Sequence, residues 1–112
     1  MIPRNKTTVR RQKDSRIEAV IARSAAQFIA REAGNESLIT VIRAQSLAHG
    51  ERMEVFVSVF PVEKTRAAFT FLERQREAFS DYLKENTNLS SLPRIDFMLD
   101  YDEHSLPEAS AR

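Results

Sequence analysis

Apolar residues recur at helical spacing between Ser15 and Ala33. The repeating positions are Ile17, Val20, Ile21, Ala25, Phe28 and Ile29. Because residues three and four apart share one face of a helix, this pattern predicts an amphipathic helix that buries one stripe. Ser15 and Glu18 have the spacing of a capping box at its start, and Gly34 is expected at the C′ position that ends it.

A β-hairpin is predicted after this helix. The segment from Leu38 to Leu47 is rich in Ile, Val and Thr, and the segment from Met53 to Phe60 places Met and Val at every second position. Residues 48–51, Ala-His-Gly-Glu, supply turn chemistry between the two segments. Pro61 lacks the amide hydrogen that a strand donates, so it is expected to end the second strand.

The helical period returns from Glu63 to Glu85, which predicts a second and longer helix. Gln75 interrupts its apolar stripe, so a kink or break is expected there. After a loop, alternation from Pro93 predicts a third strand. Its expected inward residues are Ile95, Phe97, Leu99 and Tyr101, and its expected outward residues are Arg94, Asp96, Met98 and Asp100.

The element order α-β-β-α(kinked)-β predicts an α+β fold, a two-layer sandwich with a three-stranded mixed sheet and the helices on one face. A right-handed crossover through the second helix is expected to bring strand three beside strand one, parallel to it. The other face of the sheet is expected to stay open.

Composition narrows the classes of function. The 112 residues, 42% hydrophobic and 29% charged, fit one small globular domain. The absence of Cys excludes disulfides, thiolate zinc sites, iron–sulfur clusters and a Cys nucleophile, and two glycines are too few for a phosphate-binding glycine loop. Asp100, Asp102, Glu103 and His104 lack the spacing of a metal site, and no catalytic relay surrounds either histidine. We therefore expect no enzyme, no metal and no cofactor.

The net charge of +1 is unevenly distributed. Residues 1–16 carry six Lys or Arg and one Asp, whereas residues 93–112 carry two basic and five acidic side chains. We expect a basic flexible arm at 1–13, a domain at 14–101 and a flexible tail at 102–112. No secretory signal or membrane-spanning stretch is recognisable, so a cytoplasmic protein is expected.

Basic residues near the front of the chain are candidates for phosphate contact. On a helix, Arg16 and Arg23 fall within about 40° of one another, beside the apolar stripe, and continue the basic arm. The candidate RNA-binding residues are Arg10, Arg11, Lys13, Arg16 and Arg23, with Arg74 and Arg76 near the expected kink. The alternative interpretation is a solvated helix edge with no binding role.

Several short runs carry a resemblance to a known family. They are Arg16-Ile17, Thr40-Val41, Val55-Phe56-Val57-Ser58-Val59 and Leu92-Pro93 leading into Ile95-Asp96-Phe97. In these runs and in element order, residues 14–101 resemble the ribosome-binding factor A family, which has a type II KH-like fold with a helix kink. That kink is an Ala-x-Gly in the family. This chain offers Gln75-Arg76-Glu77 by spacing or Ala78-Phe79-Ser80 by likeness.

The resemblance implies a non-catalytic ribosome-assembly factor. Such a protein binds the immature small (30S) ribosomal subunit and its 16S rRNA and promotes late rRNA processing and maturation. We expect a monomer when free, with no membrane partner.

A different class of function remains open. Phe56 and Met98 are expected on the open sheet face, where they would suit a protein-interaction or dimerisation module without RNA binding. Asp96 and Asp100 are expected on the same face, and their carboxylates should repel phosphates.

Overall fold

The computed structural model describes the backbone of residues 12–100 and the side chains of residues 15–100. Its elements are α2 (Gln12–Glu32), β1 (Leu38–Leu47), the 3-10 turn η1 (Ala48–Gly50), β2 (Arg52–Phe60), the 3-10 turn η2 (Val62–Lys64), α3 (Thr65–Arg74), α4 (Arg76–Asn86) and β3 (Arg94–Leu99). The expected tail at 102–112 and residues 1–11 of the expected arm lie outside the described residues. The proposed domain boundaries therefore stay predictions.

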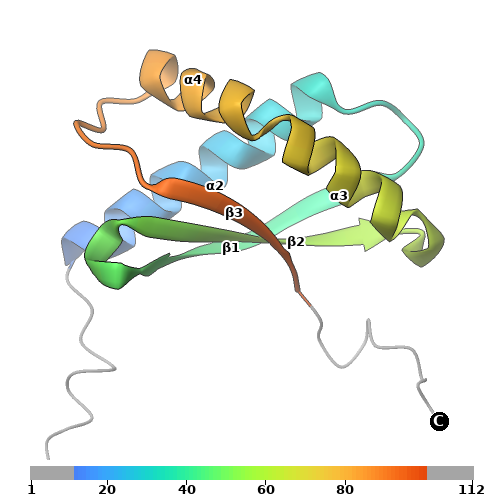
Figure 1. The fold of residues 1–112 in the computed structure, drawn as a ribbon, viewed down its shortest axis with the longest axis horizontal. Coiled ribbons are helices and arrows are strands. Elements are labelled where there is room, and N and C mark those ends of the chain that lie inside the picture. The colour runs from blue at the N-terminus through green and yellow to red at the C-terminus, as the bar shows by residue number, and fades with distance from the viewer. Residues whose placement is uncertain (1–11, 101–112) are drawn as a thin grey trace, which may run out of the picture.

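The described residues form two layers, a three-stranded sheet and a layer of helices that covers one of its faces (Figure 1). β1 and β2 pair in antiparallel fashion, and β2 and β3 pair in parallel. The predicted α+β sandwich with a mixed sheet and helices on one face is confirmed, and so is the hairpin that ends before Pro61.

The order of the strands differs from the one predicted. β3 lies beside β2, not beside β1, so the sheet order is β1-β2-β3. A crossover through helices returns the chain to the starting end of the strand it left, and the next strand can then pair in parallel with that same strand. The expectation that strand three joins strand one was wrong because it applied the crossover rule to the wrong partner.

The long second helix is two helices. Gln75 has φ −94° and ψ 4°, outside helical geometry, and separates α3 from α4. The predicted kink is confirmed, and it falls at Gln75-Arg76-Glu77. The alternative segment, Ala78-Phe79-Ser80, lies inside α4.

The predicted capping box at the start of the first helix was wrong, whereas the predicted position of Gly34 just beyond its end is confirmed. α2 begins before Ser15, so Ser15 is an interior residue and caps nothing. Glu18 is buried, and its carboxylate accepts a 2.7 Å hydrogen bond from the backbone N–H of Ser46 in β1. α2 ends at Glu32, so Ala33 is its C-cap and Gly34 stands at C′, although Gly34 does not have the positive φ common at that position. Glu18, which the capping-box spacing assigned to a local cap, instead makes a tertiary contact with β1.

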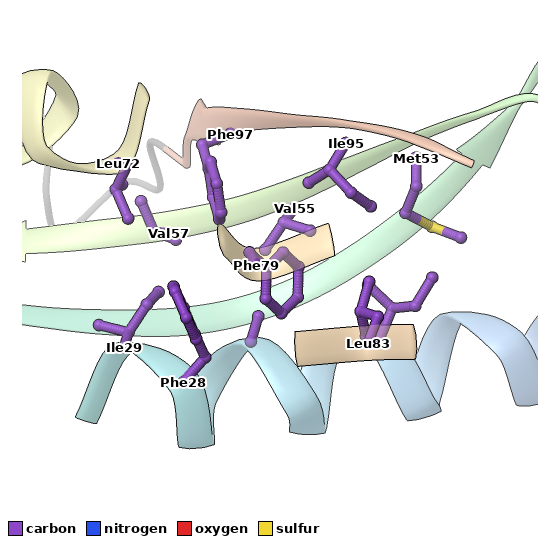
Figure 2. Close-up of a cluster of buried hydrophobic side chains, with 12 residues drawn as sticks. Phe28, Ile29, Met53, Val55, Val57, Leu72, Phe79, Leu83, Ile95 and Phe97 are labelled. Carbon is purple, nitrogen blue, oxygen red and sulfur yellow. The ribbon is translucent and has the colours of Figure 1, made fainter. Parts of the chain in front are cut away.

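A single core fills the space between the two layers (Figure 2). Its buried members are Ile21, Ala25, Phe28, Ile29, Met53, Val55, Val57, Leu72, Phe79, Leu83, Ile95 and Phe97. The ring of Phe79 lies at its centre, 5.3 Å from the ring of Phe28 and 6.0 Å from that of Phe97. The stripes that periodicity predicted for the helices and strands therefore meet in one cluster.

Candidate nucleic-acid interface

A basic strip runs along one side of α2. Arg16 and Arg23 are exposed there, on the same side as Gln27, whose amide oxygen accepts a 3.3 Å hydrogen bond from the hydroxyl of Tyr82 in α4. Among the described residues, no carboxylate lies within ion-pair distance of either guanidinium. Both charges are therefore available to a polyanion.

Arg31 extends this α2 strip by two turns beyond Arg23. Its guanidinium lies 4.9 Å from the ring centre of Tyr82 and 2.9 Å from a carboxylate oxygen of Glu32. Sequence reasoning did not select Arg31, although its helical angle places it within about 80° of Arg23. This helical angle is the feature of the sequence from which Arg31 could have been predicted. From here on, the α2 strip means Arg16, Arg23, Gln27 and Arg31.

The two arginines at the break between α3 and α4 differ from one another. Arg74 is exposed and has no ion-pair partner among the described residues. Arg76 is half-buried, and its guanidinium lies 2.9 Å from the carboxylate of Glu73 and 3.7 Å from that of Asp96. Arg76 is therefore partly neutralised by its own protein, whereas Arg74 is not.

Asp96 of β3 gathers three guanidinium groups. Besides Arg76 at 3.7 Å, Arg52 of β2 approaches its carboxylate to 3.2 Å and Arg94 to 3.7 Å. These four residues, called the Asp96 cluster below, carry three positive charges and one negative. A hollow of about 130 Å³ beside them is lined by Arg76, Glu77, Ser80, Arg94 and Ile95.

Sequence reasoning missed Arg52 and Arg94. The parallel register of β2 and β3 pairs these two residues directly, so their proximity follows from the strand order. An incorrect strand order hid it. The proximity of Arg52 and Arg94 follows from the sequence only once β3 is paired with β2.

Two of the carboxylates expected on the open sheet face are ion-paired. Arg43 pairs with Asp100 at 2.9 Å, while Asp96 has the partners named above. The guanidinium of Arg43 also covers the ring of Phe56, 4.0 Å from its centre, so that ring is half-buried. An irregularity in the pairing of β1, between Val41 and Arg43, leaves Arg43 opposite Phe56. Asp96 and Asp100 are therefore each partly neutralised by arginines of the same protein.

Some predicted residues cannot be placed. Arg10 and Arg11 lie outside the described residues, and so does the side chain of Lys13; their RNA-binding role stays a prediction. Asp102, Glu103 and His104 also lie outside. Within residues 12–100, no group of three or more His, Cys, Asp or Glu side chains could hold a metal ion. None of the described helices is both long enough and apolar enough to span a bilayer.

Two solved structures share this fold. One is the crystal structure of ribosome-binding factor A from Thermus thermophilus, with a TM-score of 0.68 and 24% sequence identity over 77% of this chain and 94% of that one. The other is the solution NMR structure of a Thermotoga maritima protein provisionally named a ribosome binding factor A, with a TM-score of 0.64 and 19% identity over 82% of this chain and 92% of that one. The KH-like fold that the resemblance implied is confirmed.

Comparison of the sequence by itself finds no corresponding match. It matches no protein-family model, and no curated protein is matched.

Proposed function

We propose that this protein is a non-catalytic ribosome-assembly factor that binds the small ribosomal subunit through its 16S rRNA and supports late maturation of that subunit. The observation that carries the proposal is the fold shared with ribosome-binding factor A over nearly the whole length of the Thermus protein. The proposal places the protein in the cytoplasm, as a monomer until it meets the subunit.

The chemistry of the helix layer supports RNA as the ligand. A guanidinium donates two parallel hydrogen bonds to a phosphate and keeps its charge at any physiological pH. Arg16 and Arg23 of the α2 strip and Arg74 at the helix break are exposed and have no carboxylate partner among the described residues. Such groups bind a phosphate backbone without giving up an internal ion pair. We assign them, with Arg10, Arg11 and Lys13, as phosphate contacts.

The Asp96 cluster is assigned a second role on the same RNA. Its carboxylate holds the guanidiniums of Arg52, Arg76 and Arg94 close together before any ligand arrives. An arriving phosphate meets arginines whose side chains are already partly ordered, which lowers the entropic cost of binding. Asp96 is therefore a positioning residue, and Arg76 contacts phosphate in competition with it.

Reversing the charge of the α2 strip tests the proposal. The double variant Arg16→Glu/Arg23→Glu is expected to bind isolated small subunits at least about tenfold more weakly than the wild type, because two attractions to phosphate become repulsions. Cosedimentation across a salt series measures this, with large subunits run in parallel. The dependence of log affinity on log salt should also become shallower by about 0.7 for each phosphate that is no longer neutralised.

The matched control reverses two exposed basic residues that lie outside the α2 strip, Lys64 at the end of η2 and Arg66 in the first turn of α3. This control variant should retain wild-type binding, and the circular dichroism of both variants should be unchanged. Equal loss in both variants would indicate a non-specific response to net charge. Absence of binding to small subunits by the wild type would contradict the proposal and leave a protein-interaction module as the function.

The role of Asp96 is tested separately. Asp96→Asn removes the carboxylate that holds the three guanidiniums together, so binding to small subunits should weaken several-fold even though the net charge becomes more positive. Stability should fall by less than about 1 kcal/mol, since these ion pairs are near the surface. Fluorescence anisotropy with a labelled 16S rRNA fragment measures the affinity. Unchanged or stronger binding by Asp96→Asn, with the fold intact, would contradict the positioning role of Asp96.

A further inference from the structure

A groove lies between the second half of α2 and the start of β1, on a different element pair from the Asp96 cluster. Its volume is about 650 Å³. One wall is made of Ala26, Ile29 and Ala30 of α2 with Ala33 just beyond its end, and the other wall is the segment Leu38–Val41 of β1. Phe60 lines the groove at the end of β2. Because Ile29 is buried and the other residues of this wall are alanines without atoms beyond Cβ, the edge of β1 stays accessible beside it.

The groove exposes the backbone of β1. Four consecutive residues, 38 to 41, line it, although alternate side chains of a strand point to opposite faces. A groove that meets all four therefore approaches the strand from its edge. Within the described part of the chain β1 pairs only with β2, so this edge has no neighbouring strand. Its unpaired N–H and C=O groups are a template for one more strand.

The two ends of the free β1 edge differ in whether a side chain already hydrogen-bonds to the backbone. Towards the end of β1, the carboxylate of Glu18 accepts the backbone N–H of Ser46, which occupies a group that an added strand would need. No side-chain hydrogen bond of this kind is made to residues 38–41 from the described part of the chain. The edge is thus blocked at one end and open at the end that borders the groove.

Large apolar side chains surround the open end. Leu38 is 64% exposed, Phe60 is 71% exposed and Val62 is 63% exposed. Leu38 and Phe60 are directly paired across β1 and β2, so they form one continuous patch at this end of the sheet. Burial of these side chains would add hydrophobic stabilisation to the backbone hydrogen bonds of an incoming strand.

The charge of the groove indicates what kind of segment fits. Glu36 is the one charged residue among the described residues that line it, and its carboxylate has no ion-pair partner in the described part of the chain. A groove whose one charged lining residue is acidic does not suit a phosphate backbone. A segment that is both basic and apolar supplies a cation for Glu36 and apolar side chains for Leu38 and Phe60.

We infer that this β1 groove binds an extended basic and apolar polypeptide segment, which adds to the sheet as a strand beside residues 38–41. The apolar side chains of the segment pack on the alanines of α2 and on Leu38 and Phe60, and a Lys or Arg of the segment pairs with Glu36. This inference does not rest on RNA binding.

The test uses the full chain, labelled with ¹⁵N, and a capped synthetic peptide of about eight residues in which Val alternates with Lys and Thr. Amide shifts of Leu38, Ile39, Thr40 and Val41 are expected to change on titration, together with that of Ala30. A peptide of the same length with Pro at alternate positions should leave them unchanged, because it cannot donate the ladder hydrogen bonds. Absence of shifts with the first peptide would overturn the inference.

Two variants and one control locate the site. Ala30→Leu fills the groove from an exposed helical position and should weaken peptide binding at least about tenfold. Glu36→Gln should weaken it several-fold and reduce its salt dependence. The matched control, Ala19→Leu, adds the same side chain to an exposed position of α2 outside the groove and should bind as the wild type does.

Three results would contradict the assignment. Equal binding by Ala30→Leu and Ala19→Leu would place the peptide elsewhere. Concentration-dependent dimerisation of the peptide-free protein in sedimentation velocity, abolished by Ala30→Leu, would make a second copy the occupant. Shifts of Leu38–Val41 on addition of poly(U) would make the groove a nucleic-acid surface. Failure of the proposed RNA function would leave the peptide result unaffected, because the two tests use different residues and ligands.

Discussion

Replacing Phe79 with alanine is expected to lower the free energy of unfolding by about 3–5 kcal/mol, the range for a large aromatic residue truncated in a core. Phe79 is fully buried, and its ring contacts Phe28 of α2, Phe97 of β3 and Tyr82 of its own helix. The cavity would open where the two layers meet, so no single element could move to fill it. This loss is comparable to the whole stability of many small domains.

Urea denaturation followed by circular dichroism measures this effect. The matched control is Phe60→Ala, since Phe60 is 71% exposed and its truncation should change stability by less than about 0.5 kcal/mol. Similar losses in the two variants would mean that Phe79 is not the centre of the core. A variant that is unfolded without urea would agree with a loss at or above the upper end of the range.

Replacing Glu18 with alanine is expected to cost about 1–3 kcal/mol, the penalty for leaving a buried hydrogen-bonding group without its partner. Glu18 is 8% exposed, and its carboxylate accepts the backbone N–H of Ser46 from β1 at 2.7 Å. Glu18 takes part in further interactions as well. Without the side chain, a backbone donor at the sheet edge has no acceptor, and the start of α2 is no longer tied to the end of β1.

The conservative variant Glu18→Gln separates two explanations. An amide oxygen still accepts the Ser46 N–H, so this variant should lose less stability than Glu18→Ala in the same urea titration. Hydrogen exchange at Ser46 gives a local reading, because its amide should exchange faster in Glu18→Ala than in Glu18→Gln. Equal exchange in both variants would argue against the hydrogen bond as the source of the stability.

Hydrophobic periodicity was sufficient to predict most elements of this fold. Burial on one face is repeated at every second residue of β2 and at every third or fourth residue of α2, so each element carries its own signal. The break at Gln75 was also predictable, because a polar residue interrupted an apolar stripe. Pro61 marked the end of β2 for a chemical reason that does not depend on the rest of the fold.

The failures share a different physical origin. Ser15 and Glu18 had the spacing of a local cap, but a contact with a strand 28 residues away determined the environment of Glu18. The pairing of β3 depended on which strand end the crossover reached, which no local pattern records. Local signals predict elements, and tertiary contacts decide how ambiguous side chains are used.

The same distinction between local signals and tertiary contacts applies to the residues of the candidate site. Arg16 and Arg23 were found because helical geometry alone places them together. The neighbours of Asp96 were missed because Arg52 and Arg94 meet through strand pairing across 42 positions of sequence. Arg76 was selected for its place near the kink, and its two carboxylate partners emerged only with the fold.

The sheet order β1-β2-β3 also constrains the order in which the described elements can assemble during synthesis. α2 and the hairpin come first and can pack on each other before residues 94–99 leave the ribosome. β3 closes a long loop by parallel pairing, which is entropically costly and slow compared with a hairpin. Until it docks, β2 has one unpaired edge and Phe79 lacks the ring of Phe97. The nascent chain therefore remains incomplete, with exposed apolar surface, up to the emergence of its last described strand.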